Sequence, residues 1–238
     1  MAGHSKWKQI KHKKAVTDSR RGAAFTKLIK EITVAARAGG GDPGANPRLR
    51  TLLEKAREIN MPIDNSQRAI KRGTGEIPGA QYEQITYEGY GPFGTAVLVD
   101  VLTDNRNKAV AEVRNIFNKK GGTLGEAGAV SWMFERKGEI RAQAGSMSED
   151  QLLEALLEAD VDNITLEEGM FFIHCPVKSL ELVRQAVANT GLKVESAEIE
   201  WLPKNPVDMG DVEQQKVMEF LEAVQDLDDV QNVYTNLG

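Results

Sequence analysis

Five lysines gather at the start of the chain around a single tryptophan. Between His4 and Lys14 these lysines occur without an acidic residue, and Trp7 is the only aromatic side chain among them. Ammonium groups contact the phosphates of a nucleic acid, and an indole ring stacks on an unpaired base. The segment predicts an arm in which Trp7 either stacks on a base or pins the arm to a helical domain. The lysines expected to bind nucleic acid are Lys6, Lys8, Lys11, Lys13 and Lys14.

Residues that could catalyse a reaction are few. His174 and Cys175 are neighbours near a strand end, where alternate side chains point to opposite faces, so they are poorly placed as a nucleophile and its base. Glu167 and Glu168 indicate a solvated turn. The run GGGDPGANP follows a helix and lacks the Gly-Lys-Ser/Thr ending of a phosphate loop, which favours a linker turn. We therefore expect no enzyme activity, no cofactor and no metal.

The charges are segregated along the chain. The 238 residues carry a net charge of -5, but Met1–Gly75 holds 17 basic against 6 acidic residues, whereas Glu76–Gly238 holds 13 against 29. A basic head on an acidic body is typical of a protein whose head binds a polyanion, although a basic helix can also be a merely solvated face. No apolar stretch approaches the roughly 20 residues of a membrane span. We expect a cytoplasmic protein without a membrane partner.

The basic residues lie on elements that form a small helical bundle. Apolar spacing predicts a helix from Arg20 to Ala38, a second that follows an Asn46 cap and Pro47, and a short third from Asn65 to Arg72 capped by Asp64. The last two can also be interpreted as a helix-turn-helix around residues 60–64, with Asn65, Gln67, Arg68 and Lys71 facing a groove. The candidate nucleic-acid contacts of this bundle are Arg20, Arg21, Lys27, Arg48, Arg50, Arg68, Lys71 and Arg72.

After Gly79 the pattern changes from helical to alternating. YEQITYEG, TAVLVDVL and AVSWMFE predict strands around a helix at 106–119, and residues 139–202 contain a complete βαββαβ set of the ferredoxin-like kind. A final helix near 212–226 and a strand at VQNVYT would complete the first set. We predict a multidomain α+β protein: a three-helix domain at 1–78 and two ferredoxin-like α/β domains, the third (137–204) inserted into the second (79–136 and 205–238).

The helix at 106–119 has a basic surface inside an acidic region. It can extend the nucleic-acid track, contact an acidic partner, or pair with neighbouring Glu112 and Glu126. The residues of this possible secondary surface are Arg106, Lys108, Arg114, Lys119 and Lys120.

Several long motifs resemble one family. GHSKWKQIKHKKAVTDSRRGAAFTKLIKEI, GGGDPGANPRLR, NMPIDNSQRAIKRGTG, YEGYGPFGTAVLVDVLTDNRNKAVAEVRNIFNKKGG and AVSWMFE together resemble the YebC/PmpR family, which includes the mitochondrial translational activator of cytochrome c oxidase subunit I. The resemblance covers essentially the whole chain. It implies three domains and a cytoplasmic, non-enzymatic regulator, and it places the arm lysines, Arg20, Arg21 and Lys27 in a nucleic-acid track, with the basic residues of the second and third helices as further candidates.

The resemblance leaves two branches open. Members look like DNA-binding transcriptional regulators in one branch and ribosome-associated translation factors, which act on proline-rich stretches, in the other. The expected function is a nucleic-acid-binding regulator of gene expression, of the transcriptional type. The first alternative is a factor that binds ribosomal RNA on the ribosome and relieves stalling. The second is an α/β protein that senses a small molecule, because βαββαβ modules often bind metabolites.

Overall fold

The computed structural model describes Trp7 and residues 18–238, with side chains at Trp7 and from residue 22 onward. Two units with dense internal contacts share this chain. One comprises the residues before Met133 together with Asn205–Gly238, and the other comprises Met133–Lys204. The predicted inserted domain, 137–204, falls within the second unit, and its bounds stay a prediction. The helical residues group with the first α+β part, and the three-domain division stays a prediction.

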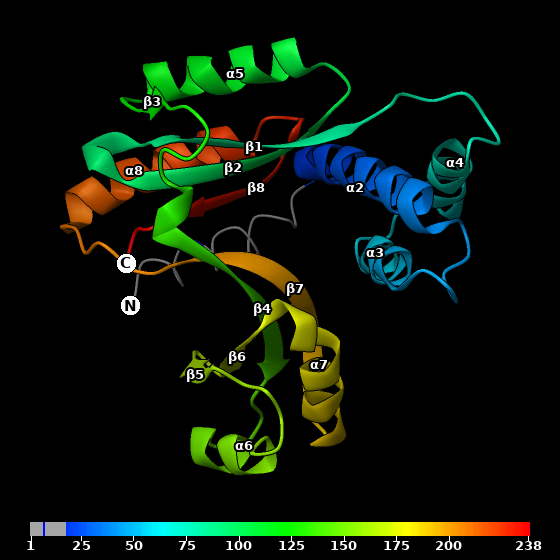
Figure 1. The fold of residues 1–238 in the computed structure, drawn as a ribbon, viewed down its shortest axis with the longest axis vertical. Coiled ribbons are helices and arrows are strands. Elements are labelled where there is room, and N and C mark those ends of the chain that lie inside the picture. The colour runs from blue at the N-terminus through cyan, green and yellow to red at the C-terminus, as the bar shows by residue number, and fades with distance from the viewer. Residues whose placement is uncertain (1–6, 8–17) are drawn as a thin grey trace. The chain divides into compact units, whose positions relative to one another are not determined.

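Three helices form the first part of the chain, as predicted (Figure 1): α2 (Asp18–Gly39), α3 (Pro47–Glu58) and α4 (Ile63–Thr74). Their apolar stripes meet in a small core that includes Leu28, Ile32, Leu49, Leu52 and Ala69. None of the described helices is long and apolar enough to cross a membrane.

Asn46 joins two of these helices, and its predicted role as the α3 cap is confirmed. Its Oδ1 accepts a hydrogen bond from the Leu49 amide at 3.1 Å, and its Nδ2 donates to the carbonyls of Ala35 and Gly40, both at 2.9 Å. The buried Asn46 side chain thus supplies hydrogen-bond partners both for a backbone amide at the start of α3 and for backbone carbonyls at the end of α2.

The expected start and end of α4 are wrong. The helix begins at Ile63 with Pro62 at the cap position, no side chain caps it, and Asp64 lies inside the first turn. It also continues through Gly73, which was expected to lie beyond its end. A Cβ at position 73 would lie 2.7 Å from the Ala36 Cβ on α2. Gly73 is therefore required by the close approach of the two helices.

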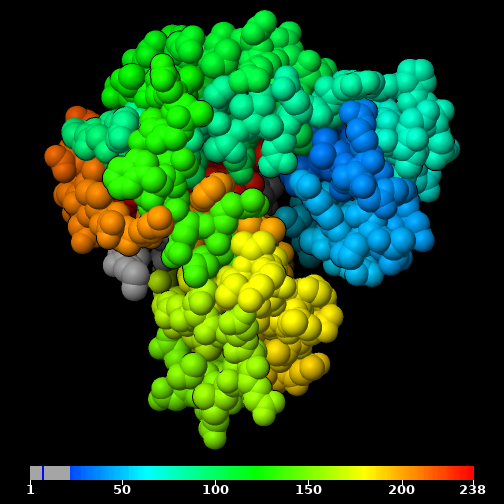
Figure 2. Space-filling model, viewed as in Figure 1, coloured from blue at the N-terminus to red at the C-terminus, as the bar shows by residue number. Residues whose placement is uncertain are grey.

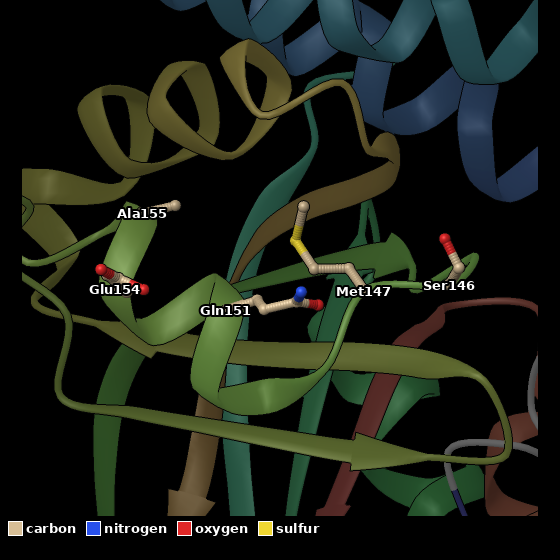
Figure 3. Close-up of a pocket in the computed structure, with 5 residues that line it drawn as sticks. All are labelled: Ser146, Met147, Gln151, Glu154 and Ala155. Carbon is tan, nitrogen blue, oxygen red and sulfur yellow. The ribbon is translucent and has the colours of Figure 1, made fainter.

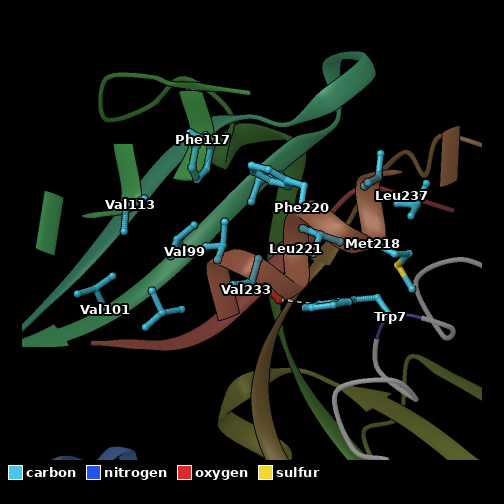
Figure 4. Close-up of a cluster of buried hydrophobic side chains, with 14 of the residues drawn as sticks. Trp7, Val99, Val101, Val113, Phe117, Met218, Phe220, Leu221, Val233 and Leu237 are labelled. Carbon is cyan, nitrogen blue, oxygen red and sulfur yellow. Dashed lines mark hydrogen bonds between the residues drawn. The ribbon is translucent and has the colours of Figure 1, made fainter. Parts of the chain in front are cut away.

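The first sheet is antiparallel and combines distant segments. It contains β1 (Glu83–Tyr90), β2 (Ala96–Thr103), β3 (Thr123–Leu124) and β8 (Val230–Thr235), in the order β3-β1-β2-β8. Two helices, α5 (Arg106–Lys119) and α8 (Asp211–Gln225), pack on it, and Phe117 meets Phe220 edge to face at 4.9 Å (Figure 4). The last helix and strand therefore complete this sheet, as the sequence suggested.

The second sheet lies wholly in the inserted unit. Its elements follow the predicted βαββαβ order: β4 (Phe134–Gln143), α6 (Glu149–Ala155), β5 (Asn163–Glu167), β6 (Met170–Cys175), α7 (Leu180–Asn189) and β7 (Lys193–Pro203). The strand order is β5-β6-β4-β7, and all pairings are antiparallel. The strand order of the first sheet, β3-β1-β2-β8, differs from that of the second, because the β1-β2 hairpin lies at its centre. The chain is mixed α+β, with a helical region and two four-stranded sheets.

The segment AVSWMFE does not form the predicted strand of the first sheet. The two-residue β3 takes that position, residues 131–133 form a short 3₁₀ turn, and Phe134 opens β4. Glu88 on β1 explains why no strand forms here. Its buried carboxylate accepts hydrogen bonds from the backbone amides of Gly128, Val130 and Ser131, at 2.8–2.9 Å. Because these three amides bond to a side chain, they are not available to pair with a neighbouring strand.

Glu88 makes a charge-dependent contribution to stability. Burial by itself raises the pKa of its carboxyl, but the three backbone hydrogen bonds outweigh burial, and the pKa lies below its ordinary value of 4.5. A carboxylate with a lowered folded pKa stabilises the fold at neutral pH, and this stabilisation is lost as the pH falls through the folded value.

We expect Glu88→Gln to reduce the free energy of unfolding at pH 7 by about 1–3 kcal/mol, because an amide group replaces one accepting oxygen. The difference from the unsubstituted protein should narrow as the pH falls through the lowered pKa of this carboxyl, below its ordinary value of 4.5. Urea unfolding at several pH values measures both effects. Glu83→Gln, an exposed change on the same strand, is the control. A Glu88 effect as small as that of the control would contradict the assigned role.

Candidate nucleic-acid interface

Exposed cations line the outer surfaces of α3 and α4, which Figure 2 shows in cyan. Each of the predicted contacts on these helices is exposed, and none has an ion pair with another described residue. Uncompensated charges of this kind can bind phosphates without first breaking an internal salt bridge. We call this set the basic face; it comprises Arg48, Arg50, Arg57, Arg68, Lys71 and Arg72.

Arg57 is a member of the basic face that the candidate set did not include. It lies in the last turn of α3, exposed, and has no ion pair with another described residue. Its position off the apolar stripe of the helix was the available signal. Arg72 differs from the others because its side chain is also a packing surface: a Cβ at Gly79 would lie 2.9 Å from the Arg72 Cγ.

The connection between α3 and α4 is a turn over residues 59–62. Asn60 takes a left-handed conformation, with φ of 56°, in place of the glycine that such turns often contain. Gln67, Arg68 and Lys71 are exposed on α4, while Asn65 is half-buried. Three of the four side chains expected to face a groove are therefore accessible, and the helix-turn-helix interpretation stays a prediction.

Lys27 contacts the first unit's own backbone rather than presenting its charge to solvent. Its Nζ donates to the Gln225 carbonyl at the end of α8, at 2.5 Å, and its side chain is half-buried. A cation at a helix C-terminus stabilises the exposed carbonyls there. This contact argues against the predicted role of Lys27 in nucleic-acid binding.

A buried ion pair lies close to this contact. Lys30 forms a salt bridge with Asp229, and its Nζ also donates to the Asp228 carbonyl at 3.1 Å. The other carboxylate oxygen of Asp229 accepts a hydrogen bond from the Thr103 hydroxyl at 2.9 Å. Although burial alone raises the pKa of Asp229, the bonds from Lys30 and Thr103 outweigh it and hold the pKa below its usual value. The helical part is thereby joined to the sheet.

Trp7 is anchored and does not present its ring for stacking. It is 2% exposed, belongs to the core of the first sheet, and its Nε1 donates to the Val233 carbonyl at 3.1 Å (Figure 4). The base-stacking interpretation is therefore not supported. The alternative, a pin for the arm, fits the geometry, but the anchor point is the sheet and not the helical part.

The remaining N-terminal candidates fall outside the detailed description. Lys6, Lys8, Lys11, Lys13 and Lys14 lie outside the described residues. Arg20 and Arg21 lie on α2, but their side chains are not described. Their roles stay predictions.

The basic residues of α5 are also exposed. Lys108 is 3.7 Å from the Glu112 carboxylate, which fits the pairing alternative for this residue. No ion pair with a described residue involves the other four, and Glu126 pairs with none of them. The remaining members of this second surface are Arg106, Arg114, Lys119 and Lys120.

The described residues offer little catalytic chemistry. Cys175 is buried, and burial followed by the charges of Asp162 and Asp160 raises the pKa of its thiol to about 11, so the thiol is protonated at neutral pH. His174 bonds through Nε2 to the Glu139 carboxylate at 2.9 Å. No group of three or more His, Cys, Asp or Glu within the described positions is placed to hold a metal.

A shallow hollow beside α6 is one feature that could hold a small ligand (Figure 3). Its lining includes Met147, Glu154 and Gln151. Gln151 is already engaged, because its side chain accepts the Ser148 amide at 2.9 Å in a capping box. The hollow therefore gives no specific support to a metabolite-sensing role.

Comparison with known proteins covers nearly the whole chain. A family profile described as the TACO1/YebC protein N-terminal domain matches residues 5–76, and one described as the TACO1/YebC second and third domain matches residues 82–237. Relatives named "probable transcriptional regulatory protein" occur in Chlorobaculum tepidum and Desulfosudis oleivorans. The first is 50% identical over 100% of this chain and 95% of the relative, and the second is 50% identical over 99% and 96%.

A solved structure is similar as well. The crystal structure of a conserved hypothetical protein from Aquifex aeolicus superposes with a TM-score of 0.84 and 44% sequence identity, over 93% of this chain and 91% of that one. The order of helices and sheets, the two matching profiles and these identities agree. The chain belongs to the TACO1/YebC family.

Proposed function

We propose that this protein regulates gene expression by binding the sugar-phosphate backbone of a nucleic acid through the basic face and the lysines of the arm. The observation that carries the proposal is that the basic face is exposed and has no ion pair with other described residues. Each cation placed against a phosphate releases condensed counterions, which favours binding. The protein acts as a cytoplasmic binding protein and not as an enzyme.

The charge distribution also favours binding of the nucleic acid by the helical part of the chain. Residues from Glu76 onward carry 29 acidic against 13 basic side chains and repel a polyanion, so binding is directed to the helical part. Phosphate contacts fix the position of a protein on nucleic acid but carry little sequence information. Base reading would fall to Gln67 and its neighbours on α4, and we expect weak sequence preference.

The names of the relatives favour DNA as the polymer and transcription as the regulated step. Ribosomal RNA presents the same phosphate chemistry, so association with the ribosome is the alternative outcome. Sedimentation of cell lysate at low and high salt separates the two. Comigration with ribosomes that salt releases supports translation, whereas retention on promoter fragments without ribosome association supports transcription.

The basic face can be tested on α4 alone. We expect the double variant Arg68→Ala/Lys71→Ala to flatten the plot of log affinity against log salt by about 1–2 units for duplex DNA, because two phosphate contacts are lost. Fluorescence anisotropy across a salt series measures the slope. Lys178→Ala/Lys193→Ala removes two exposed cations of the inserted unit and should leave it unchanged. Equal slopes in both variants would remove α4 from the interface.

The arm requires a different variant, because deleting residues 1–14 would also remove Trp7 from the core. Replacing all five arm lysines by alanine while keeping Trp7 should flatten the salt slope by roughly 3–5 units if each lysine contacts a phosphate. The same anisotropy series measures this change. Thermal unfolding of the variant is the control, and it should match the unsubstituted protein. An unchanged slope in the folded variant would exclude the arm from binding.

A further inference from the structure

Two exposed aromatic side chains outside the basic face share one hydrogen-bond acceptor. The Tyr90 hydroxyl donates to the Ala129 carbonyl at 3.2 Å, and the Trp132 Nε1 donates to the same oxygen at 3.1 Å. Tyr90 is 40% exposed and Trp132 is 64% exposed. A single carbonyl therefore orients two accessible rings, which we call the aromatic pair.

The carbonyl that orients the pair is itself held in place. Ala129 lies in the loop whose amides at Gly128, Val130 and Ser131 bond to the buried Glu88 carboxylate. Glu88 and Tyr90 are two residues apart on β1, so their side chains leave the same face of the strand. The loop and Tyr90 are fixed to one strand, and the rings do not have to be ordered when a ligand binds.

The chemistry of the pair suits a flat ligand. Tyrosine and tryptophan each have one polar atom that normally seeks a partner when they bind another molecule. Here both polar atoms already bond to Ala129. What the two side chains offer to a ligand is aromatic surface, which stacks well on a nucleobase because every base has a π-face.

Two lysines precede the segment that pairs with Tyr90. Thr123 on β3 pairs with Tyr90, and Gly122 lies so close to β1 that a Cβ there would be 2.7 Å from the Tyr90 carbonyl oxygen. The exposed Lys119 and Lys120 immediately precede this contact in the chain. Between Lys120 and Trp132 the sequence contains one acidic residue, Glu126. Aromatic surface beside lysines is the combination used by proteins that bind single strands.

We propose that Tyr90 and Trp132 form a stacking site for unpaired bases of a single-stranded nucleic acid, with Lys119 and Lys120 contacting the adjoining phosphates. This inference rests on the proposed function for the polymer, but it adds a requirement for unpaired bases that the basic face does not impose. It also assigns a role to part of the α5 surface. A polypeptide ligand fits less well, because neither the hydroxyl nor the indole N–H is available to bond to a peptide carbonyl.

The test compares two single strands with the same backbone and uses the full-length protein. One is an oligouridylate of about 12 nucleotides, and the other is an abasic oligomer of the same length. We expect Trp132→Ala to weaken oligouridylate binding about 10-fold and to leave abasic binding unchanged, because only the first ligand can stack. Trp132→Phe keeps a ring and should stay within about 2-fold of the unsubstituted protein. Leu182→Ala, at another exposed apolar side chain, is the matched control.

Intrinsic fluorescence gives a second readout. Stacking should quench tryptophan emission when oligouridylate is added, and Trp132→Phe should remove most of that quenching, because Trp132 is the exposed tryptophan, whereas Trp7 is buried and Trp201 is half-buried. Equal losses of affinity for both oligomers in Trp132→Ala, or no loss for either, would overturn the stacking site. Failure of the basic face has a different signature: Arg68→Ala/Lys71→Ala would then leave both affinities unchanged. If neither oligomer binds the unsubstituted protein, the stacking site fails, whereas the basic face is still tested by its binding to duplex DNA.

Discussion

The buried pair of Lys30 and Asp229 is the constraint on which the arrangement of the first unit depends. Removing two charges from water is costly, and such a pair persists only where further hydrogen bonds satisfy both groups. Thr103 on β2 and the Asp228 carbonyl supply those bonds. Helix α2, the central strand β2 and the turn before β8 therefore meet at one point, and the orientation of the basic helices relative to the first sheet follows from it.

The basic and aromatic residues of the N-terminal part have two different roles, one structural and one at the surface. Lys27 contacts the last residue of α8, Lys30 contacts the turn that follows it, and Trp7 contacts β8, so all three serve the interior of the unit. The basic face of α3 and α4 contacts no acidic partner among the described residues. A cluster of positive residues in the sequence thus contains both structural and surface members. The proposed function depends on the exposed residues of the basic face. Trp7 anchors its part of the chain to β8.

Local patterns predicted the parts of the fold that local interactions determine. Apolar periodicity located the helices and most strands, and Asn46 with Pro47 located a real cap. The errors have long-range causes. Trp7 bonds to a carbonyl 226 residues away, and Glu88 bonds to amides 40 to 43 residues away, so neither contact leaves a periodic signal. The aromatic pair depends on the Glu88 loop and was missed for the same reason. Exposed arginines off the apolar stripes, in contrast, could be named directly.

The large sequence separation between β2 and β8, which pair in the first sheet, has a consequence for biosynthesis. The sheet lacks an edge strand, and Lys30 and Trp7 lack their partners, until residues 228–235 have left the ribosome. The inserted unit is contiguous in sequence and can fold earlier, since domains generally fold as units during translation. The inserted unit of the nascent chain can therefore become ordered before the basic helical part acquires its contacts with α8 and the turn before β8.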